Sequence, residues 1–196
     1  LRVGKLLAPH GIRFIVVPEM DGVHSTADDP IPIPEGLVPA IQNQLDIGSV
    51  PGPPAIEVFV NEAWIPVGAQ LTGPTAAASR LAGADALVRA DLDEASPTLV
   101  GADAWQAASG AAQPGTVHLA IPYDERLKLT VDGREITSRP SFGVGTGFDV
   151  ETAGTAVLGY ERDSSRPLWL AVQAVLWIAA LAVGVGSQAQ FVRRRS

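Results

Sequence analysis

A nearly uninterrupted apolar segment near the C-terminus places the strongest constraint on the fold of this chain. Residues 168–186 contain one polar side chain, Gln173, and no charged side chain. An α-helix rises 1.5 Å per residue, so about 20 apolar residues cross a hydrocarbon core of about 30 Å. A buried core helix of this length without any polar face is rare in a domain this small. The sequence therefore predicts one transmembrane helix over residues 167–191.

Charge is divided sharply along the chain, and the division predicts the orientation of that helix. All 21 acidic residues lie at or before Asp163, together with ten of the 14 lysines and arginines, so residues 1–163 carry a formal charge of −11. A basic tail with three consecutive arginines, residues 192–196, follows the apolar segment. By the positive-inside rule, the tail is expected in the cytoplasm and residues 1–163 outside the cell membrane. An acidic surface repels phosphates, so nucleic acid is not an expected partner.

The first 71 residues predict a small α/β element. Residues 12–17 form an apolar run between a glycine and a proline, which predicts a buried strand. Residues 35–46 carry apolar side chains at helical spacing and predict a short amphipathic helix, and residues 55–60 predict a second strand. The chain opens on residues typical of a helix interior and not of a signal peptide, so we expect it to be part of a longer polypeptide.

The next region has a weaker pattern. Residues 72–114 are rich in alanine, glycine and serine and predict an irregular connector. Within it, residues 75–82 favour a short helix, and residues 86–90 and 98–100 favour strands.

From residue 115 onward the pattern is β-rich. Apolar and polar side chains alternate over residues 127–131, which predicts a strand with one buried and one wet face. Asp132-Gly133 follows as a hairpin signal, because a type I′ turn needs positive φ at both central positions. Five short strands with tight turns predict an antiparallel β-sandwich over residues 115–163. The expected fold class is α+β: a small α/β element, an antiparallel β-sandwich and one C-terminal transmembrane helix.

Patterns that indicate catalysis or metal binding are weak. The three histidines, His10, His24 and His118, have no metal-ligand spacing, and no serine has an evident histidine and aspartate partner. Residues 91–93 match the D-x-D pattern with which many glycosyltransferases hold a metal and a nucleotide sugar, but no nucleotide-binding α/β domain is predicted around them. A solvated acidic turn is the expected structure there. We expect no catalytic, cofactor-binding or metal-binding residue in this chain.

Two further patterns have a structural and a functional interpretation. Gly143, Gly145 and Gly147 resemble a phosphate loop, but neither a helix nor a Lys-Ser/Thr ending follows, so a bend or bulge between strands is expected. Aromatic side chains more often anchor a core than stack on sugar rings. The candidates for such stacking are Trp64, Trp105 and Tyr123.

The order of several segments resembles that of a known family. These are residues 6–18 (LLAPHGIRFIVVP), 44–47 (QLDI), 61–64 (NEAW), 127–133 (LKLTVDG) and 140–143 (PSFG), followed by the terminal helix. They resemble the C-terminal extracytoplasmic region of large actinobacterial polytopic membrane glycosyltransferases of the family 2 type. The last part is also similar to the C-terminal β-domain of the YfhO family, which is linked to envelope glycan modification. Leu127 stands where the pattern usually has tryptophan.

The resemblance implies a non-catalytic extracytoplasmic domain and the last membrane helix of a polytopic cell-envelope glycosyltransferase, with catalysis in an upstream part. The implied partners are the lipid bilayer, upstream transmembrane helices of the same chain, and an envelope glycan or polyprenyl-linked sugar that the domain positions. No cofactor is implied for this part. The alternative is a single-pass, membrane-anchored surface domain that binds a protein or a polysaccharide.

Overall fold

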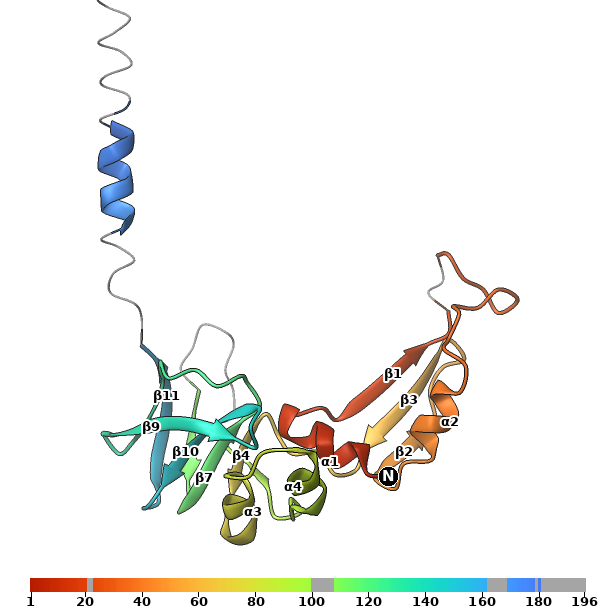
Figure 1. Cartoon of the computed structure of the whole chain (residues 1–196), viewed down its shortest axis with the longest axis horizontal. Coiled ribbons are helices and arrows are strands. Elements are labelled where there is room, and N and C mark those ends of the chain that lie inside the picture. Colours follow the sequence, from red (N-terminus) through yellow and green to blue (C-terminus); the bar gives the residue numbers. More distant parts are fainter. Residues whose placement is uncertain (21–22, 100–107, 162–168, 179, 181–196) are drawn as a thin grey trace, which may run out of the picture. The chain divides into compact units, whose positions relative to one another are not determined.

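The computed structural model describes residues 1–20, 23–99, 108–161, 169–178 and 180 (Figure 1). The chain divides into two compact units, Leu1–Tyr160 and Glu161–Ser196. The first unit contains a three-stranded sheet, an eight-stranded sheet and several short helices, and every strand pair in it is antiparallel. The predicted combination of helices with antiparallel strands is therefore confirmed.

The three-stranded sheet has the order β1-β3-β2. Its strands are β1 (Phe14–Pro18), β2 (Ile47–Val50) and β3 (Ile56–Asn61). Helix α2 (Leu37–Gln42) packs its apolar side chains against one face of the sheet, around the fully buried Phe59. The predicted amphipathic helix and the two predicted strands of this region are confirmed.

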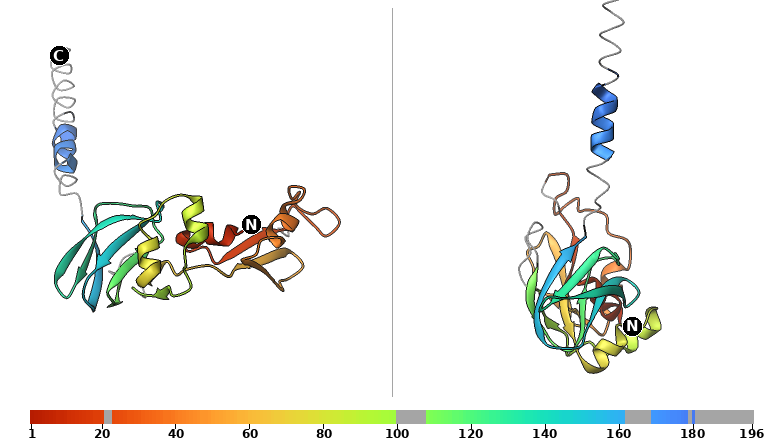
Figure 2. Two further views of the ribbon diagram at one scale, coloured as in Figure 1. Left: turned by 60° about the horizontal axis from the view of Figure 1, so that its bottom comes forward. Right: turned by 90° about the vertical axis from the view of Figure 1, so that its left-hand side faces the viewer.

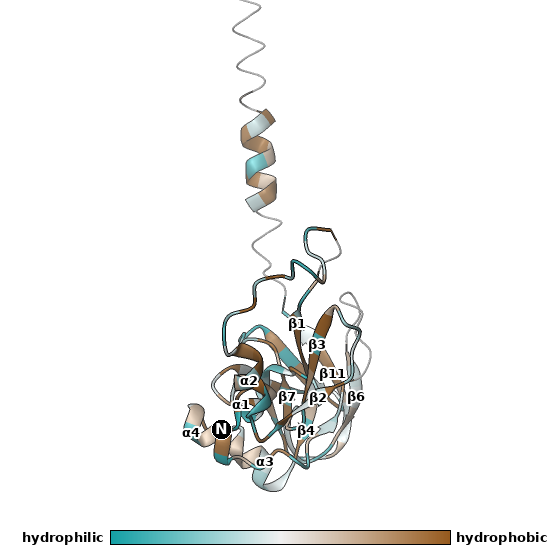
Figure 3. Ribbon diagram, turned by 90° about the vertical axis from the view of Figure 1, so that its right-hand side faces the viewer, coloured by the Kyte–Doolittle hydropathy of each residue, from teal (hydrophilic) through white to brown (hydrophobic). Residues whose placement is uncertain are grey.

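The opposite face of this sheet is apolar and partly open. Phe14 and Val16 point to it opposite Val60 and Val58 of β3, and they remain 51% and 52% exposed. Figure 3 shows hydrophobic colour along much of β1 and β3. The prediction of a buried strand over residues 12–17 is correct for Val17, which is 6% exposed, and wrong for Phe14 and Val16. Their face of the sheet stays open in the described part of the chain.

The second sheet has eight strands in the order β5-β4-β7-β10-β9-β8-β11-β6. The predicted β-sandwich over residues 115–163 is therefore corrected to one curled sheet, which β4, β5 and β6 join from earlier in the chain (Figure 2). The strands are β4 (Gly68–Leu71), β5 (Ser96–Pro97), β6 (Ser109–Ala112), β7 (Gly115–Leu119), β8 (Leu127–Val131), β9 (Arg134–Ser141), β10 (Gly145–Val150) and β11 (Gly154–Tyr160).

The curl of the sheet encloses its main core. The first half of β9 pairs with β8 and the second half with β10, so this long strand connects the two halves of the sheet. The two outer strands of the sheet are β5 and β6. The hydroxyl of Thr98, directly after β5, donates to the Ala111 carbonyl of β6 at 2.9 Å, which brings the two edges of the sheet together. The enclosed apolar cluster includes Leu129 and Phe148, both fully buried. One sheet thus provides both walls of this core.

Short helices pack on the outer face of the sheet near β4. They are α1 (Val3–Leu7), the 3₁₀ helix η1 (Ala8–His10), α3 (Gly73–Ala78) and α4 (Ala84–Arg89). Helix α3 confirms the predicted short helix. The predicted strand over residues 86–90 is wrong, because Leu87 and Ala90 are spaced to bury one helical face and the segment is rich in helix formers. The other predicted strand, residues 98–100, is wrong for residues 98 and 99, because strand β5 ends at Pro97; residue 100 lies outside the described residues.

Residues 169–178 and 180 are helical. In the described part of the chain, no helix is long and apolar enough to cross a membrane. The other residues of the predicted transmembrane helix and the basic tail lie outside the described residues. The transmembrane helix therefore stays a prediction.

A candidate ligand pocket between two separating strands

Strands β9 and β10 pair over only part of their length. Their pairs run from Gly145 with Ser141 to Phe148 with Ser138. In the same register, residues 149–152 would continue by facing residues 134–137, but β9 there pairs with β8 only. The two strands separate at this point, and the backbone groups that would have joined them face a gap.

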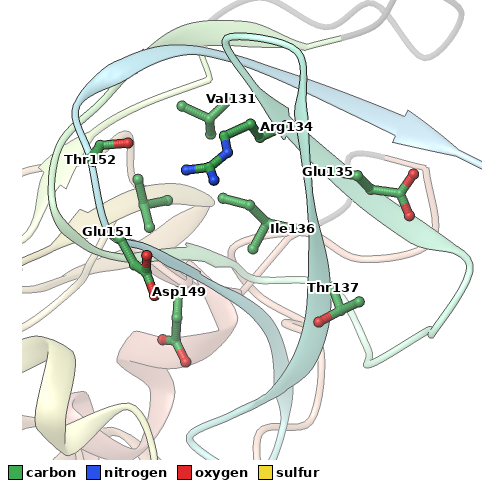
Figure 4. Close-up of a pocket in the computed structure, with 9 residues that line it drawn as sticks. Val131, Arg134, Glu135, Ile136, Thr137, Asp149, Glu151 and Thr152 are labelled. Carbon is green, nitrogen blue, oxygen red and sulfur yellow. The ribbon is translucent and has the colours of Figure 1, made fainter.

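The gap is a pocket of about 360 Å³ (Figure 4), within the size range of small-molecule sites. It is lined by four residues of β9, by the end of β10 with the two residues after it, and by one residue of β8. The lining residues are Val131, Arg134, Glu135, Ile136, Thr137, Asp149, Val150, Glu151 and Thr152. The pocket therefore occupies the place of the pairs that β9 and β10 do not form.

The turn between β8 and β9 explains why β9 follows β8 here. Asp132 and Gly133 have φ angles of 46° and 84°, as the predicted type I′ hairpin requires. The Asp132 carboxylate also accepts a hydrogen bond from the Thr155 backbone N–H at 2.8 Å, which ties the turn to β11. The first residues of β9 are thereby held on the β8–β11 side of the sheet, away from β10.

The pocket combines an apolar floor with charged walls. Val131 and Val150 belong to the enclosed core cluster, and Ile136 packs against it. Figure 4 shows the side chains of Arg134 and Ile136 extending into the space between the strands, whereas Glu135 points away from it. Arg134, Glu151 and Thr152 are exposed. The site therefore offers apolar contact below and charged or hydroxyl groups above.

The carboxylate of Asp149 has strong partners of its own. It forms ion pairs with Arg139 at 2.7 Å and with Arg80 at 2.7 Å, and the Thr116 hydroxyl donates to it at 2.9 Å. Hydrogen bonding from Arg139 lowers the pKa of Asp149 below its usual value, against the smaller opposing effect of burial. This carboxylate stays ionised and fixed in place at neutral pH, so it is poorly suited to proton transfer.

The other three charged residues of the pocket differ in whether their side chains have partners. The Glu135 carboxylate pairs with the Lys128 ammonium at 3.2 Å on the outside of the hairpin. Neither Arg134 nor Glu151 forms a hydrogen bond or ion pair through its side chain within the described residues. Arg134 lines the pocket from β9, and Glu151 lines it from the residues after β10. They are the groups best placed to contact a ligand.

The three glycines that resemble a phosphate loop have structural roles. Gly143 lies in the turn after β9 with φ 74°, where glycine is favoured. A Cβ on Gly145 would lie 2.6 Å from the His118 ring, and one on Gly147 would lie 3.4 Å from the Arg139 guanidinium. These glycines make the turn and leave room for two side chains that cross β10. The predicted bend is confirmed at Gly143.

The structure also brings together a serine and a histidine that sequence analysis did not pair. The His118 Nδ1 lies 2.9 Å from the Ser141 hydroxyl, and Nε2 lies 3.0 Å from the Pro9 carbonyl. Since a carbonyl only accepts, Nε2 carries the proton and Nδ1 accepts from Ser141. Burial lowers the pKa of His118 to about 4. Both side chains are fully buried, so the pair joins η1 to the sheet and has no access to a substrate.

Of the aromatic residues proposed for sugar stacking, neither Trp64 nor Tyr123 lines the pocket. Trp64 is half-buried, with the Arg13 guanidinium 4.7 Å from its ring centre. Tyr123 is 46% exposed, and Trp105 lies outside the described residues. Within the described ranges, no group of three histidine, cysteine or acidic residues is placed to hold a metal ion.

The other sequence patterns lie in structural positions. The Asp93 backbone N–H donates to the Asp91 carboxylate at 3.2 Å in an exposed turn. The Asp46 carboxylate accepts from the Lys5 backbone N–H at 2.9 Å in the first turn of α1. The buried Asn61 side chain donates to the Gly4 carbonyl of α1 at 2.9 Å. The QLDI and NEAW segments of the family resemblance therefore meet at α1, away from the pocket.

Comparison with known proteins does not add a family assignment. The chain matches no family model, no curated protein and no solved structure. The resemblance to membrane glycosyltransferases therefore stays a hypothesis.

Proposed function

We propose that residues 1–160 form a non-catalytic glycan-binding domain outside the cell, joined to the last membrane helix of a cell-envelope glycosyltransferase. The glycan binds in the pocket between β9 and β10. The observation that carries this proposal is that Arg134 lines the pocket from β9 and Glu151 lines it from the residues after β10, together with the partly exposed Ile136.

This arrangement matches the chemistry of a sugar ring. A pyranose has C–H groups on its faces and hydroxyls around its edge, so it needs apolar contact together with donors and acceptors. The partly exposed Ile136 offers the apolar contact, the Arg134 guanidinium donates and the Glu151 carboxylate accepts. The backbone groups of β9 and β10 that lack a pairing partner add further donors and acceptors along both walls.

The charged groups near the pocket favour binding over catalysis. General acid–base chemistry needs a side chain whose proton can move at neutral pH. In the pocket, Asp149 is held ionised by Arg139; His118 does not line the pocket and is fully buried. Catalysis is accordingly assigned to an upstream part of the parent polypeptide, where a polyprenyl-linked sugar is the expected substrate.

The proposed membrane anchor rests on the apolar segment and on the charge division described above. Within the described helical residues, Trp169, Leu176 and Ile178 are 68%, 64% and 66% exposed. Large apolar side chains exposed along a helix are stabilised by lipid or by neighbouring membrane helices. The bilayer and upstream helices of the same polypeptide are the partners proposed for this segment.

Binding measurements on the full chain in lipid nanodiscs test the proposal. The probes are neutral and acidic oligosaccharides released from an actinobacterial cell envelope. Arg134→Ala combined with Glu151→Gln is expected to weaken binding at least about tenfold, because two hydrogen-bonding groups are lost. Arg89→Ala, on the exposed surface of α4, is the matched control and is expected to keep full affinity.

Two results would contradict the proposal. Binding that does not change in the double variant would place the glycan elsewhere, and an absence of binding would remove the glycan-binding role. Robust sugar transfer by the chain alone would show that the domain is catalytic.

A single-pass surface domain that binds a protein is the second candidate. The observation that favours it is the open apolar face carried by Phe14 and Val16 on β1. The coding sequence upstream of Leu1 separates the two candidates. Many hydrophobic spans there would support the glycosyltransferase, and a lone signal peptide would support the surface domain.

A further inference from the structure

We infer that the pocket between β9 and β10 selects a sugar residue with one anionic group, a carboxylate or a phosphate, which pairs with Arg134. This inference rests on the proposed function, because it names the class of glycan that the same pocket binds.

The charge balance of the pocket points to this class. Arg134 is the only cation among the lining residues, which also include three carboxylates. Two of these carboxylates are already neutralised, Asp149 by Arg139 and Glu135 by Lys128. A ligand therefore meets one guanidinium and one carboxylate, Glu151, that have no partner among the residues the structure describes.

The position of Arg134 is fixed at its backbone. It pairs with Val131 across the type I′ turn, and Figure 4 shows its side chain extending over the apolar floor of the pocket. A guanidinium is a planar fork that binds carboxylate or phosphate oxygens through two parallel hydrogen bonds. A neutral hydroxyl does not form this pair of charge-assisted hydrogen bonds, so Arg134 is expected to raise the affinity most for an anionic sugar.

The opposite wall indicates that the anion belongs to a sugar. Glu151 repels a second negative charge but accepts hydrogen bonds from hydroxyls, and Thr152 adds a hydroxyl of its own. A simple anion would use only the Arg134 side, whereas an acidic sugar uses both walls. The domain's overall negative charge is screened beyond about 8 Å at physiological salt, so it leaves this local pairing largely intact.

Pairs of ligands in which one member lacks the anionic group provide the test. Binding of an oligogalacturonate and of its methyl ester is measured by titration calorimetry on the full chain in nanodiscs, at physiological salt. Glucose 6-phosphate and glucose form a second pair. The acidic member of at least one pair is expected to bind about tenfold tighter, and the pair that shows the difference identifies carboxylate or phosphate.

Two variants test whether Arg134 causes the preference for the acidic ligands. Arg134→Gln is expected to remove the difference between the acidic and neutral ligands, and Arg89→Gln, an exposed arginine of α4, is expected to keep it. An undiminished preference in Arg134→Gln would overturn the assignment. Equal binding within both pairs would overturn the inference while the proposed function stands. If envelope oligosaccharides also fail to bind, both are overturned.

Discussion

The Arg139 guanidinium holds the Asp149 carboxylate through two parallel hydrogen bonds, from Nε to Oδ2 at 2.9 Å and from Nη2 to Oδ1 at 2.7 Å. Arg139 lies in the part of β9 that still pairs with β10. Asp149 is the first residue of β10 beyond the last pair that the two strands form. The ion pair therefore fixes both strands where they begin to separate, beside the pocket that Asp149 lines.

Removing the charge of Asp149 is expected to lower the free energy of unfolding by about 1–2 kcal/mol in Asp149→Asn, because Arg139 loses its charged partner. The Asp149 side chain is 36% exposed, so solvent screening keeps the loss in this range. Arg80→Gln removes a contact of a 60% exposed side chain to the same carboxylate and is expected to cost less than about 1 kcal/mol. Urea unfolding of the full chain, followed by near-ultraviolet circular dichroism, measures both values. Equal losses would contradict this order.

The buried His118 is expected to make the fold sensitive to acid. Its pKa falls from 6.5 to about 4 in the folded chain, so the unfolded state binds more protons between these values. Stability is therefore complete above pH 6.5 and decreases as pH falls toward 4, by about 3 kcal/mol in total. The pH dependence of urea unfolding measures this slope, and carbon-13 NMR of the imidazole measures the pKa directly. A His118 ring that titrates near pH 6.5 would contradict the prediction.

The two glycines of β10 are expected to be intolerant of alanine. A Cβ at Gly145 would lie 2.6 Å from both the His118 ring and the Leu119 carbonyl, whereas one at Gly147 would lie 3.0 Å from the Ser141 Cβ. Overpacking typically costs about 1–3 kcal/mol, so Gly145→Ala should be the more destabilising of the two. Gly159→Ala is the matched control, because its Cβ would meet one atom at 3.8 Å. Thermal unfolding ranks the three variants, and a control as unstable as Gly145→Ala would show that the close contacts do not matter.

Local sequence patterns predicted several of the helices and strands, but neither the single curled sheet nor the pocket. The Asp132-Gly133 turn and the alternation in β8 are local, since each depends on residues close together in sequence. The pocket depends on where the β9–β10 pairing stops, which is decided by how β9 is shared between two neighbouring strands. The pairing of His118 with Ser141 likewise joins residues 23 positions apart through strand register. No spacing rule in the sequence specifies which strands become neighbours.

The two phenylalanines of the small sheet are expected to respond differently to truncation. Phe59 is fully buried under α2, so Phe59→Ala is expected to cost about 3–5 kcal/mol. Phe14 is 51% exposed on the open face, so Phe14→Ala is expected to cost less than about 1.5 kcal/mol, roughly half of a full burial. Urea unfolding compares them. A loss at Phe14 as large as at Phe59 would show that another surface covers the open face, as the protein-binding candidate requires.

The proposed membrane span makes a prediction that labelling can test, because the chain has no cysteine. The chain is exported behind a cleavable signal peptide with one cysteine introduced at a time, by Ala153→Cys in the first unit or Ser196→Cys in the basic tail. An apolar segment of about 20 residues halts translocation, and the arginines after it stay in the cytoplasm. A membrane-impermeant maleimide is therefore expected to label the Ala153→Cys variant in intact cells, and the Ser196→Cys variant only after the cells are opened. Labelling of both variants in intact cells would mean that residues 168–186 do not span the membrane, and the anchor would have to be abandoned.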